Sequence, residues 1–156
     1  MLFLLFQLGK DRYALDAGQI IEVLPLLALK EVPQSPKGIA GLFSYHGVLV
    51  PVVDVCETLL SRPAHPALST RLVLVRHPDG SGGERLLGFI VEKATGTIQL
   101  DPTDFSDSGV ANDGTPCLGP VVVDPKGLIQ WIEPQKLLSE SVRDALFRQI
   151  AEADNP

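Results

Sequence analysis

The stretch from Gly47 to Val55 constrains the fold more than any other, because it reads G-V-L-V-P-V-V-D-V and is apolar on both faces of an extended chain. A strand of this kind must be covered on both sides by the rest of the protein, so Val48 to Val53 are expected to be buried. Pro51 cannot donate to a sheet ladder, which predicts an edge or a bulge at this point of the strand. Asp54 is predicted to end the strand and to cap a helical turn over Cys56 to Leu60.

The rest of the chain predicts many short strands. Glycine and proline, at 14 and 13 of 156 residues, favour frequent turns over long helices. Turn signals predict hairpins that pair 2–8 with 12–15, 71–76 with 86–91, and 118–123 with 128–132, and a further strand is expected over 94–100.

Helices are expected at two places. Apolar residues three apart favour a short helix over 17–23, and the tail from Glu140 has the apolar stripe of an amphipathic helix. Ser141 and Asp144 form a candidate capping box at its start. The acidic stretch from Asp101 to Pro116 predicts an exposed loop.

Two segments of the chain have a similar pattern. Gly47-Val-Leu…Leu59-Leu60 and Gly127-Leu-Ile…Leu137-Leu138 both run from a glycine through an apolar strand to a short turn that ends in Leu-Leu. The pattern indicates either two similar β-units in one domain or a chance similarity between two strand-to-helix joins.

Composition excludes several classes of protein. The net charge of -6 and the absence of a basic run argue against nucleic acid as a partner. The apolar N-terminus lacks the basic region of a signal peptide, and no stretch approaches the roughly 18 apolar residues needed for insertion into a membrane. Two cysteines are too few for a disulfide scaffold and fit a reducing cytoplasm.

No catalytic, metal or cofactor site is expected. Ser44, His46 and Asp54 are the one Ser/His/Asp grouping within a short segment. If the chain between His46 and Asp54 is extended, eight steps of about 3.3 Å separate them by roughly 26 Å, whereas a catalytic hydrogen bond needs about 3 Å. The three histidines are far apart in sequence and neither cysteine has metal-ligand spacing.

One run of residues resembles a known family. Val32-Pro33…Ile39-Ala-Gly-Leu-Phe43-Ser-Tyr-His-Gly47-Val-Leu-Val-Pro-Val-Val-Asp54-Val is similar to the signature of the CheW-like coupling proteins of bacterial chemosensory arrays. In that signature a proline loop and a short I-x-G turn lead into R-G-x-x-x-P-V-x-D-L. Further similarity lies in 4–15, 85–91 and 127–138, so the resemblance covers most of the chain and rests on the order and spacing of its elements.

The resemblance implies a mostly β fold of two intertwined SH3-like five-stranded β-barrels with a C-terminal α-helix. Within a single domain over 1–156, it implies one subdomain from about 16–92, a second from 1–15 and 93–138, and the helix over 139–153. It implies a non-enzymatic scaffold in the cytoplasm at membrane-bound receptor arrays. One surface would hold the regulatory domain of a CheA-type histidine kinase, and a groove between the barrels would hold the cytoplasmic tip of a methyl-accepting chemotaxis receptor.

The same resemblance implies where partners bind. The candidate partner-binding residues are Glu22, Ser44, Tyr45, His46, Gly47 and Asp54. Where the family usually has Asn-Leu-Arg-Gly, this chain has Ser-Tyr-His-Gly, so a histidine replaces the family's contact arginine. Arginine is permanently charged and histidine is mostly neutral at pH 7, so partner choice is expected to differ from that of the flagellar system. Glu92 matches a position where the family usually has a carboxylate, with a change in length.

Two other functions rank below this one. A small-molecule sensor, or another protein-interaction module, could use the same barrels, and a sensor predicts a closed apolar pocket. A hydrolase that uses Ser44 and His46 ranks last, and predicts turnover that is lost on His46→Ala.

Overall fold

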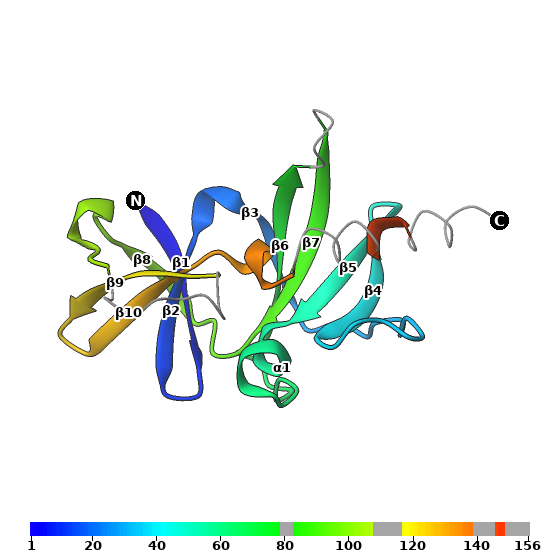
Figure 1. Cartoon of the computed structure of the whole chain (residues 1–156), viewed down its shortest axis with the longest axis horizontal. Helices are drawn as coiled ribbons and strands as arrows, with labels where there is room; N and C mark the ends of the chain where they lie inside the picture. The colour runs from blue at the N-terminus through cyan, green and yellow to red at the C-terminus, as the bar shows by residue number, and fades with distance from the viewer. Residues whose placement is uncertain (79–82, 108–116, 139–145, 149–156) are drawn as a thin grey trace.

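The computed structural model describes residues 1–78, 83–107, 117–138 and 146–148. Within these residues, ten strands form two five-stranded sheets. Figure 1 shows how the strands are arranged. Sheet A has the order β8-β1-β2-β10-β9 and contains β1 (Leu2–Leu8), β2 (Asp11–Asp16), β8 (Gly96–Gln99), β9 (Leu118–Asp124) and β10 (Gly127–Ile132). Sheet B has the order β3-β6-β7-β5-β4 and contains β3 (Ile20–Pro25), β4 (Ile39–Tyr45), β5 (Val48–Asp54), β6 (Arg71–Pro78) and β7 (Glu84–Val91). The expected mostly β fold with two five-stranded units is confirmed.

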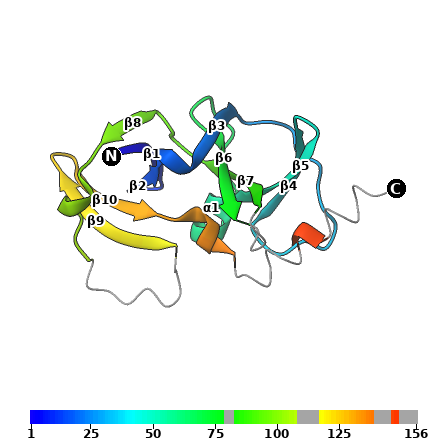
Figure 2. The ribbon, with the colours of Figure 1, turned by 90° about the horizontal axis from the view of Figure 1, so that it is seen from above.

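The helical elements of the described residues are short. They are η1 (Ala17–Gln19), α1 (Val55–Leu60), η2 (Pro102–Asp104) and η3 (Pro134–Leu137). In Figure 2 the two sheets lie side by side along the long axis of the molecule, with α1 near the region where they meet. No helix of the described residues is long and apolar enough to cross a membrane.

The two sheets repeat one pattern of strand pairing. The hairpins β1–β2 and β6–β7 each pair in parallel with a strand of a second hairpin, β10–β9 and β5–β4 respectively. The fifth strand is β8 beside β1 in sheet A and β3 beside β6 in sheet B. The weak sequence similarity around Gly47 and Gly127 therefore reflects two similar β-units. We propose that these sheets are the two subdomains, divided near residues 16 and 92.

The buried residues of the core form three clusters, and β5 contributes to two of them. Val50 and Val52 face the interior of sheet B with Leu72, Leu74 and Ile90, whereas Val53 faces the cluster between the sheets. Phe6, Leu15 and Phe89 are among the residues of that inter-sheet cluster. A third cluster, Phe3, Ala14, Val122 and Ile129, fills sheet A. The predicted coverage of β5 on both faces is confirmed.

Two details of β5 differ from or refine the prediction. Val48 is 52 % exposed, so the expectation that it is buried is wrong, and complete burial starts at Val50. Val48 follows the hairpin turn directly and lies before the pairing with β7, which covers Val52 to Asp54. Pro51 lies where β5 pairs with β4 alone, which confirms a locally unpaired edge at the proline.

The expected helix over 17–23 is wrong beyond residue 19. Only η1 is helical, and the chain continues as β3, which pairs antiparallel with β6. A register shift between Ile20 and Glu22 inserts an extra residue, so Ile21 and Leu24 pack on the same cluster although they are three apart. A β-bulge therefore produces the spacing that had indicated a helix.

The other predicted strands and turns are confirmed where they are described. The three hairpins, the strand near 96–99 and the helical turn α1 all form. Residues 101–107 are exposed apart from the half-buried Phe105, whereas 108–116 lie outside the described residues. Most of the expected helix over 139–153, including Ser141 and Asp144, also lies outside them. Residues 146–148 are helical, and Leu146 is buried in the inter-sheet cluster. The guanidinium carbon of Arg85 lies 4.5 Å from the centroid of the Phe147 ring.

Candidate partner-binding surface

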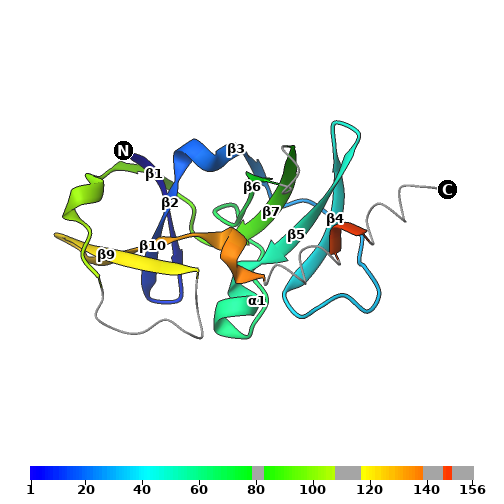
Figure 3. The same ribbon diagram turned by 45° about the horizontal axis from the view of Figure 1, so that its top comes forward.

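Four of the predicted site residues form the tip of the β4–β5 hairpin. Tyr45 pairs with Val48, so His46 and Gly47 make a two-residue turn. Both have positive φ, 50° and 84°, as a type I′ turn requires, and such turns match the twist of the strands they join. Figure 3 shows this hairpin at the end of the molecule away from β9 and β10. His46 is therefore held out at a tightly defined turn.

Glu22 reaches the same place from the other edge of sheet B. The Tyr45 hydroxyl donates a 2.6 Å hydrogen bond to Oε2 of Glu22, although the two residues lie on the outer strands β4 and β3. This bond links the two edge strands, so sheet B is curled towards a barrel. It also raises the pKa of the Tyr45 hydroxyl, because ionisation would remove the donated proton and place a second negative charge beside the carboxylate.

Aromatic contacts fix the rest of the tip. The imidazole of His46 packs edge-on against the ring of Tyr45, with 4.4 Å between centroids, and Phe43 lies 6.3 Å from Tyr45 on the same hairpin. We name the hairpin-tip surface as Glu22, Ser44, Tyr45, His46, Gly47 and Val48. All are exposed except the half-buried Tyr45, so the surface offers polar, aromatic and apolar contacts in one rigid patch.

Asp54 lies apart from this surface, at the opposite end of β5. It is 5 % exposed, and its Oδ1 accepts hydrogen bonds from the backbone N–H groups of Cys56 and Glu57, at 3.0 and 3.3 Å. Its Oδ2 accepts a 2.9 Å bond from Ala64 N–H. The predicted helix cap is confirmed, and the side chain has no free face for a partner here. The structure does not bring Asp54 to His46, so the two do not form a triad with Ser44.

A partly buried ion pair that the sequence did not reveal lies between the sheets. Glu92 is 7 % exposed and binds both terminal nitrogens of Arg62, at 2.9 and 3.1 Å, and the backbone N–H of His65 at 2.6 Å. The Arg62 guanidinium is the main reason that the pKa of Glu92 is lowered to about 2. Burial, followed by the nearby Glu92 charge, raises the pKa of the Cys56 thiol to about 12. Glu92 directly follows the apolar strand β7, but nothing in the sequence indicates that it pairs with Arg62.

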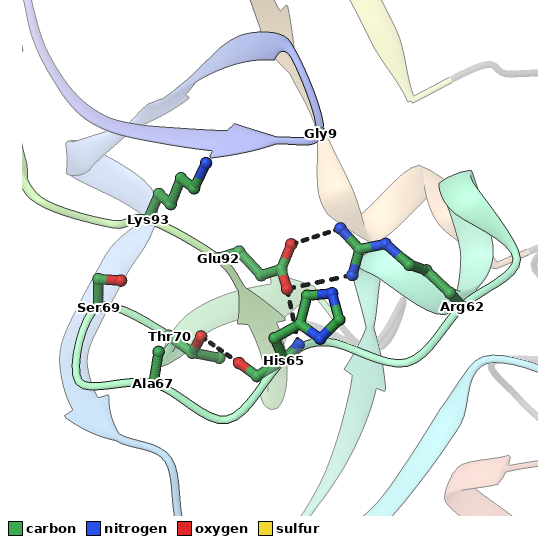
Figure 4. Close-up of a pocket in the computed structure, with 8 residues that line it drawn as sticks. All are labelled: Gly9, Arg62, His65, Ala67, Ser69, Thr70, Glu92 and Lys93. Carbon is green, nitrogen blue, oxygen red and sulfur yellow. Dashed lines mark hydrogen bonds and ion pairs between the residues drawn. The ribbon is translucent and has the colours of Figure 1, made fainter.

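An open pocket of about 150 Å³ lies beside this ion pair. Figure 4 shows it lined by Gly9 of the β1–β2 turn, by the segment from Arg62 to Thr70, and by Glu92 and Lys93 at the end of β7. The pocket is open and six of its eight lining residues have charged or polar side chains, whereas a small-molecule sensor predicts a closed apolar pocket. The described residues contain no group of three or more His, Cys, Asp or Glu side chains placed to hold a metal ion.

The fold and the hairpin-tip surface define a small double-sheet β protein with an exposed contact patch. The family model for the CheW-like domain matches residues 2–142. The chain therefore belongs to the CheW-like family, which confirms the resemblance seen in its sequence.

Relatives support this assignment at low identity. Chemotaxis protein CheW of Helicobacter pylori is 26 % identical over 103 residues, 66 % of this chain and 59 % of the relative. Chemotaxis protein CheW of Klebsiella aerogenes is 22 % identical over 98 residues, 63 % of this chain and 56 % of the relative. Protein FrzA of Myxococcus xanthus is 24 % identical over 111 residues, 71 % and 66 % of the two chains. The matched segments thus span less than the full length of each relative.

A solved structure confirms the fold. The crystal structure of scaffolding protein TtCheW from Thermoanaerobacter tengcongensis matches with a TM-score of 0.75 at 20 % identity. The match covers 88 % of this chain and 87 % of that protein. The arrangement of the two sheets is therefore that of the CheW fold.

Proposed function

We propose that this chain is a non-enzymatic adaptor that couples methyl-accepting chemoreceptors to a CheA-type histidine kinase in a bacterial chemosensory array. Membership of the CheW-like family supports the proposal, because the relatives are named as chemotaxis proteins and TtCheW is named as a scaffolding protein. The observation that carries it is the hairpin-tip surface, where exposed side chains are fixed before any partner arrives.

The kinase regulatory domain is the proposed partner of the hairpin-tip surface. A rigid patch loses little side-chain freedom on binding, so more of its contact energy is available as affinity. The Tyr45–Glu22 hydrogen bond and the edge-on His46 ring provide this rigidity. An imidazole in place of the family's arginine reduces permanent positive charge, which favours a partner surface without a matching carboxylate cluster.

The cytoplasmic tip of the receptor is the second proposed partner, in a groove between the two subdomains. The two-sheet architecture supports this proposal, since an apolar helical hairpin suits a groove between packed sheets. We place the protein in the cytoplasm, recruited to membrane-bound receptor arrays. The net charge of -6 supports neither nucleic acid nor an anionic lipid surface as a direct partner.

Capture of partners from cell extract tests the proposal. The full chain is immobilised and exposed to cell extract, and retained receptor and CheA-type kinase are identified by mass spectrometry. We expect both to be retained. Retention of neither would contradict the adaptor function.

The hairpin-tip surface is tested by calorimetry with the retained kinase. His46→Ala is expected to raise the dissociation constant for the kinase by roughly tenfold, which corresponds to a loss of about 1.4 kcal/mol at an interface contact. The matched control is Lys126→Ala, since Lys126 lies in the β9–β10 turn, which is equivalent to the β4–β5 turn in the other sheet. Equal affinities for His46→Ala and the unmodified chain would show that His46 does not contact the kinase. The adaptor function itself would then still be decided by the capture experiment.

A further inference from the structure

The pocket beside the Arg62–Glu92 pair lies where the two sheets meet. Gly9, in the turn between β1 and β2, forms one side of it, and the segment after α1 together with Lys93 forms the other. The backbone N–H of Gln7 donates to the carbonyl oxygen of Glu92 at 3.2 Å, which joins sheet A to the end of β7 here. At about 150 Å³ the pocket is smaller than the roughly 300 Å³ of sites for drug-sized ligands, so its size suits an ion or a short acid.

At the floor of the pocket the negative charge of Glu92 is neutralised by Arg62. Both carboxylate oxygens of Glu92 are bound by Arg62, and one of them also accepts from the His65 backbone. Thr70 is buried, and its hydroxyl donates to the His65 carbonyl at 2.6 Å, which fixes the loop. With Glu92 neutralised by Arg62, the remaining charge on the pocket is the Lys93 ammonium.

The rim presents three donors that other groups do not use. The side chains of Lys93, His65 and Ser69 form no hydrogen bond or ion pair with the part of the chain that the structure describes. In Figure 4 the Lys93 side chain extends towards the β1–β2 turn, and the His65 ring lies beside the Arg62–Glu92 pair. An ammonium, a hydroxyl and an imidazole around one small cavity are the donors that bind oxyanions in proteins.

Lys93 also has a strained backbone. Its φ is 50°, in the left-handed region that non-glycine residues rarely adopt. This conformation occurs directly after β7 and places Lys93 on the pocket while the next residue, Ala94, is buried in the inter-sheet cluster. Strain of this kind is concentrated at binding sites, which agrees with the unused donors.

We propose that this pocket binds a compact oxyanion, with Lys93, His65 and Ser69 as its donors. The anion is either a free ion of phosphate size or a carboxylate, whose shared chemistry is a small group of negatively charged oxygens. A ligand held between Gly9 and Lys93 would contact both sheets, so its binding would stabilise their relative position. This inference does not depend on the proposed coupling function.

Anion titrations of the isotope-labelled full chain test the proposal by NMR, at constant ionic strength and pH 7, with sodium phosphate and sodium acetate as separate probes. We expect saturable shifts of the amide signals of Gly9, Thr70 and Lys93. Lys93→Asn removes the ammonium group, and asparagine tolerates the left-handed backbone conformation. This variant should raise the apparent Kd for the anion about tenfold. Lys126→Asn, the same change on the β9–β10 turn, should leave the Kd unchanged.

The two probes distinguish the sources of the anion. Binding of phosphate alone supports a free ion, and binding of both supports a carboxylate such as an acidic side chain. Ser69→Ala leaves the backbone unaltered and should raise the Kd about threefold. It serves as the second variant if Lys93→Asn does not fold. Linear shifts without saturation, or a Kd that neither Lys93→Asn nor Ser69→Ala alters, would overturn the proposal.

Discussion

Gly41 illustrates how one residue fixes the loop before the hairpin-tip surface. Lys30 pairs with Leu42 on the outer edge of β4, through N–H to O hydrogen bonds of 2.9 and 2.8 Å. A Cβ at Gly41 would lie 2.5 Å from the Lys30 carbonyl oxygen and 3.0 Å from the Leu29 Cβ. The I-x-G motif noted in the sequence lies at the irregular start of β4 and is not a turn, and it requires glycine because backbone approaches backbone there.

Gly41→Ala is expected to lower the free energy of unfolding by about 2 kcal/mol or more, because the added methyl meets backbone that cannot move aside. Gly47→Ala is the matched control, since Gly47 also has positive φ but would place its Cβ in open space. It should cost only about 1 kcal/mol of backbone strain. Urea unfolding of both variants measures the difference, and equal losses would contradict the close approach.

For individual residues, the sequence predicts where a side chain lies in its strand or turn, but not which distant side chain it contacts. Ser44 to Gly47 could be located at a turn from their order alone, and Asp54 as a cap from its place after a strand. The bond between Tyr45 and Glu22 could not be predicted, because it depends on how far sheet B curls. The same holds for Arg62 and Glu92, which are joined by the packing of a loop against the end of a strand.

Among the elements, β5 shows how position along a strand decides burial. Val48 and Val50 lie two residues apart on the same strand and are 52 % and 0 % exposed. The difference arises because Val50 packs in the core cluster of sheet B, whereas Val48 lies next to the hairpin turn and outside that cluster. Side-chain type is identical at both positions, so the environment alone distinguishes them.

Val50→Asp is expected to unfold the domain, since an unpaired buried charge costs several kcal/mol against a total stability of about 5 to 15 kcal/mol. Val48→Asp should change the free energy of unfolding by less than about 1 kcal/mol, because its side chain remains in water. Circular dichroism melts of both variants provide the measurement. A cooperative melt of Val50→Asp near the temperature of the unmodified chain would contradict the burial of Val50.

Strand prediction succeeded where apolar residues alternate or run continuously between turn residues, as in β1, β5 and β6. It failed at β3, where the bulge between Ile20 and Glu22 replaces the period of two with a spacing of three. Sequence patterns report the spacing of buried side chains and not its cause. The pairing of β3 with β6 joins residues about 50 positions apart, and it selects the bulged strand over a helix. A local sequence pattern does not contain this information.

Two partly buried ion pairs lie in different parts of the molecule, one where the sheets meet and one at the end of sheet A. Arg12 and Asp124 join β2 to the β9–β10 turn, with 2.9 Å between Nη1 and Oδ2. The hydrogen bond to Arg12 is the main reason that the pKa of Asp124 is lowered from 3.8 to about 2. The pKa of Glu92 is lowered from 4.5 to about 2 by Arg62 in the same way.

These shifts predict a loss of stability in acid. Both carboxylates have a lower pKa in the folded protein, so the unfolded chain binds protons first as the pH falls. The stabilisation from Glu92, on the order of 2 to 3 kcal/mol, is complete above pH 4.5 and is lost between about pH 4.5 and 2. Glu92→Gln should flatten the pH dependence of the free energy of unfolding in this range.

The control is Glu84→Gln, because Glu84 is 65 % exposed and lies 3.6 Å from Arg76 in a surface pair. Surface pairs contribute about 0 to 1 kcal/mol, so this variant should keep the slope of the unmodified protein. Urea unfolding at pH 2, 3, 5 and 7 gives the curves. Identical slopes for Glu92→Gln and the unmodified chain would show that Glu92 does not govern the acid response.

The intertwined path of the chain has a consequence for the order of events during synthesis. Every strand of sheet B lies within residues 20–91, so this sheet can complete its pairing while the ribosome is still adding the rest. The β1–β2 hairpin emerges first but gains its parallel neighbour β10 almost last. We expect a nascent chain stalled once residue 95 has left the ribosomal exit tunnel to protect sheet B from protease while the β1–β2 hairpin is still cleaved, so that a hairpin made before sheet B is secured after it.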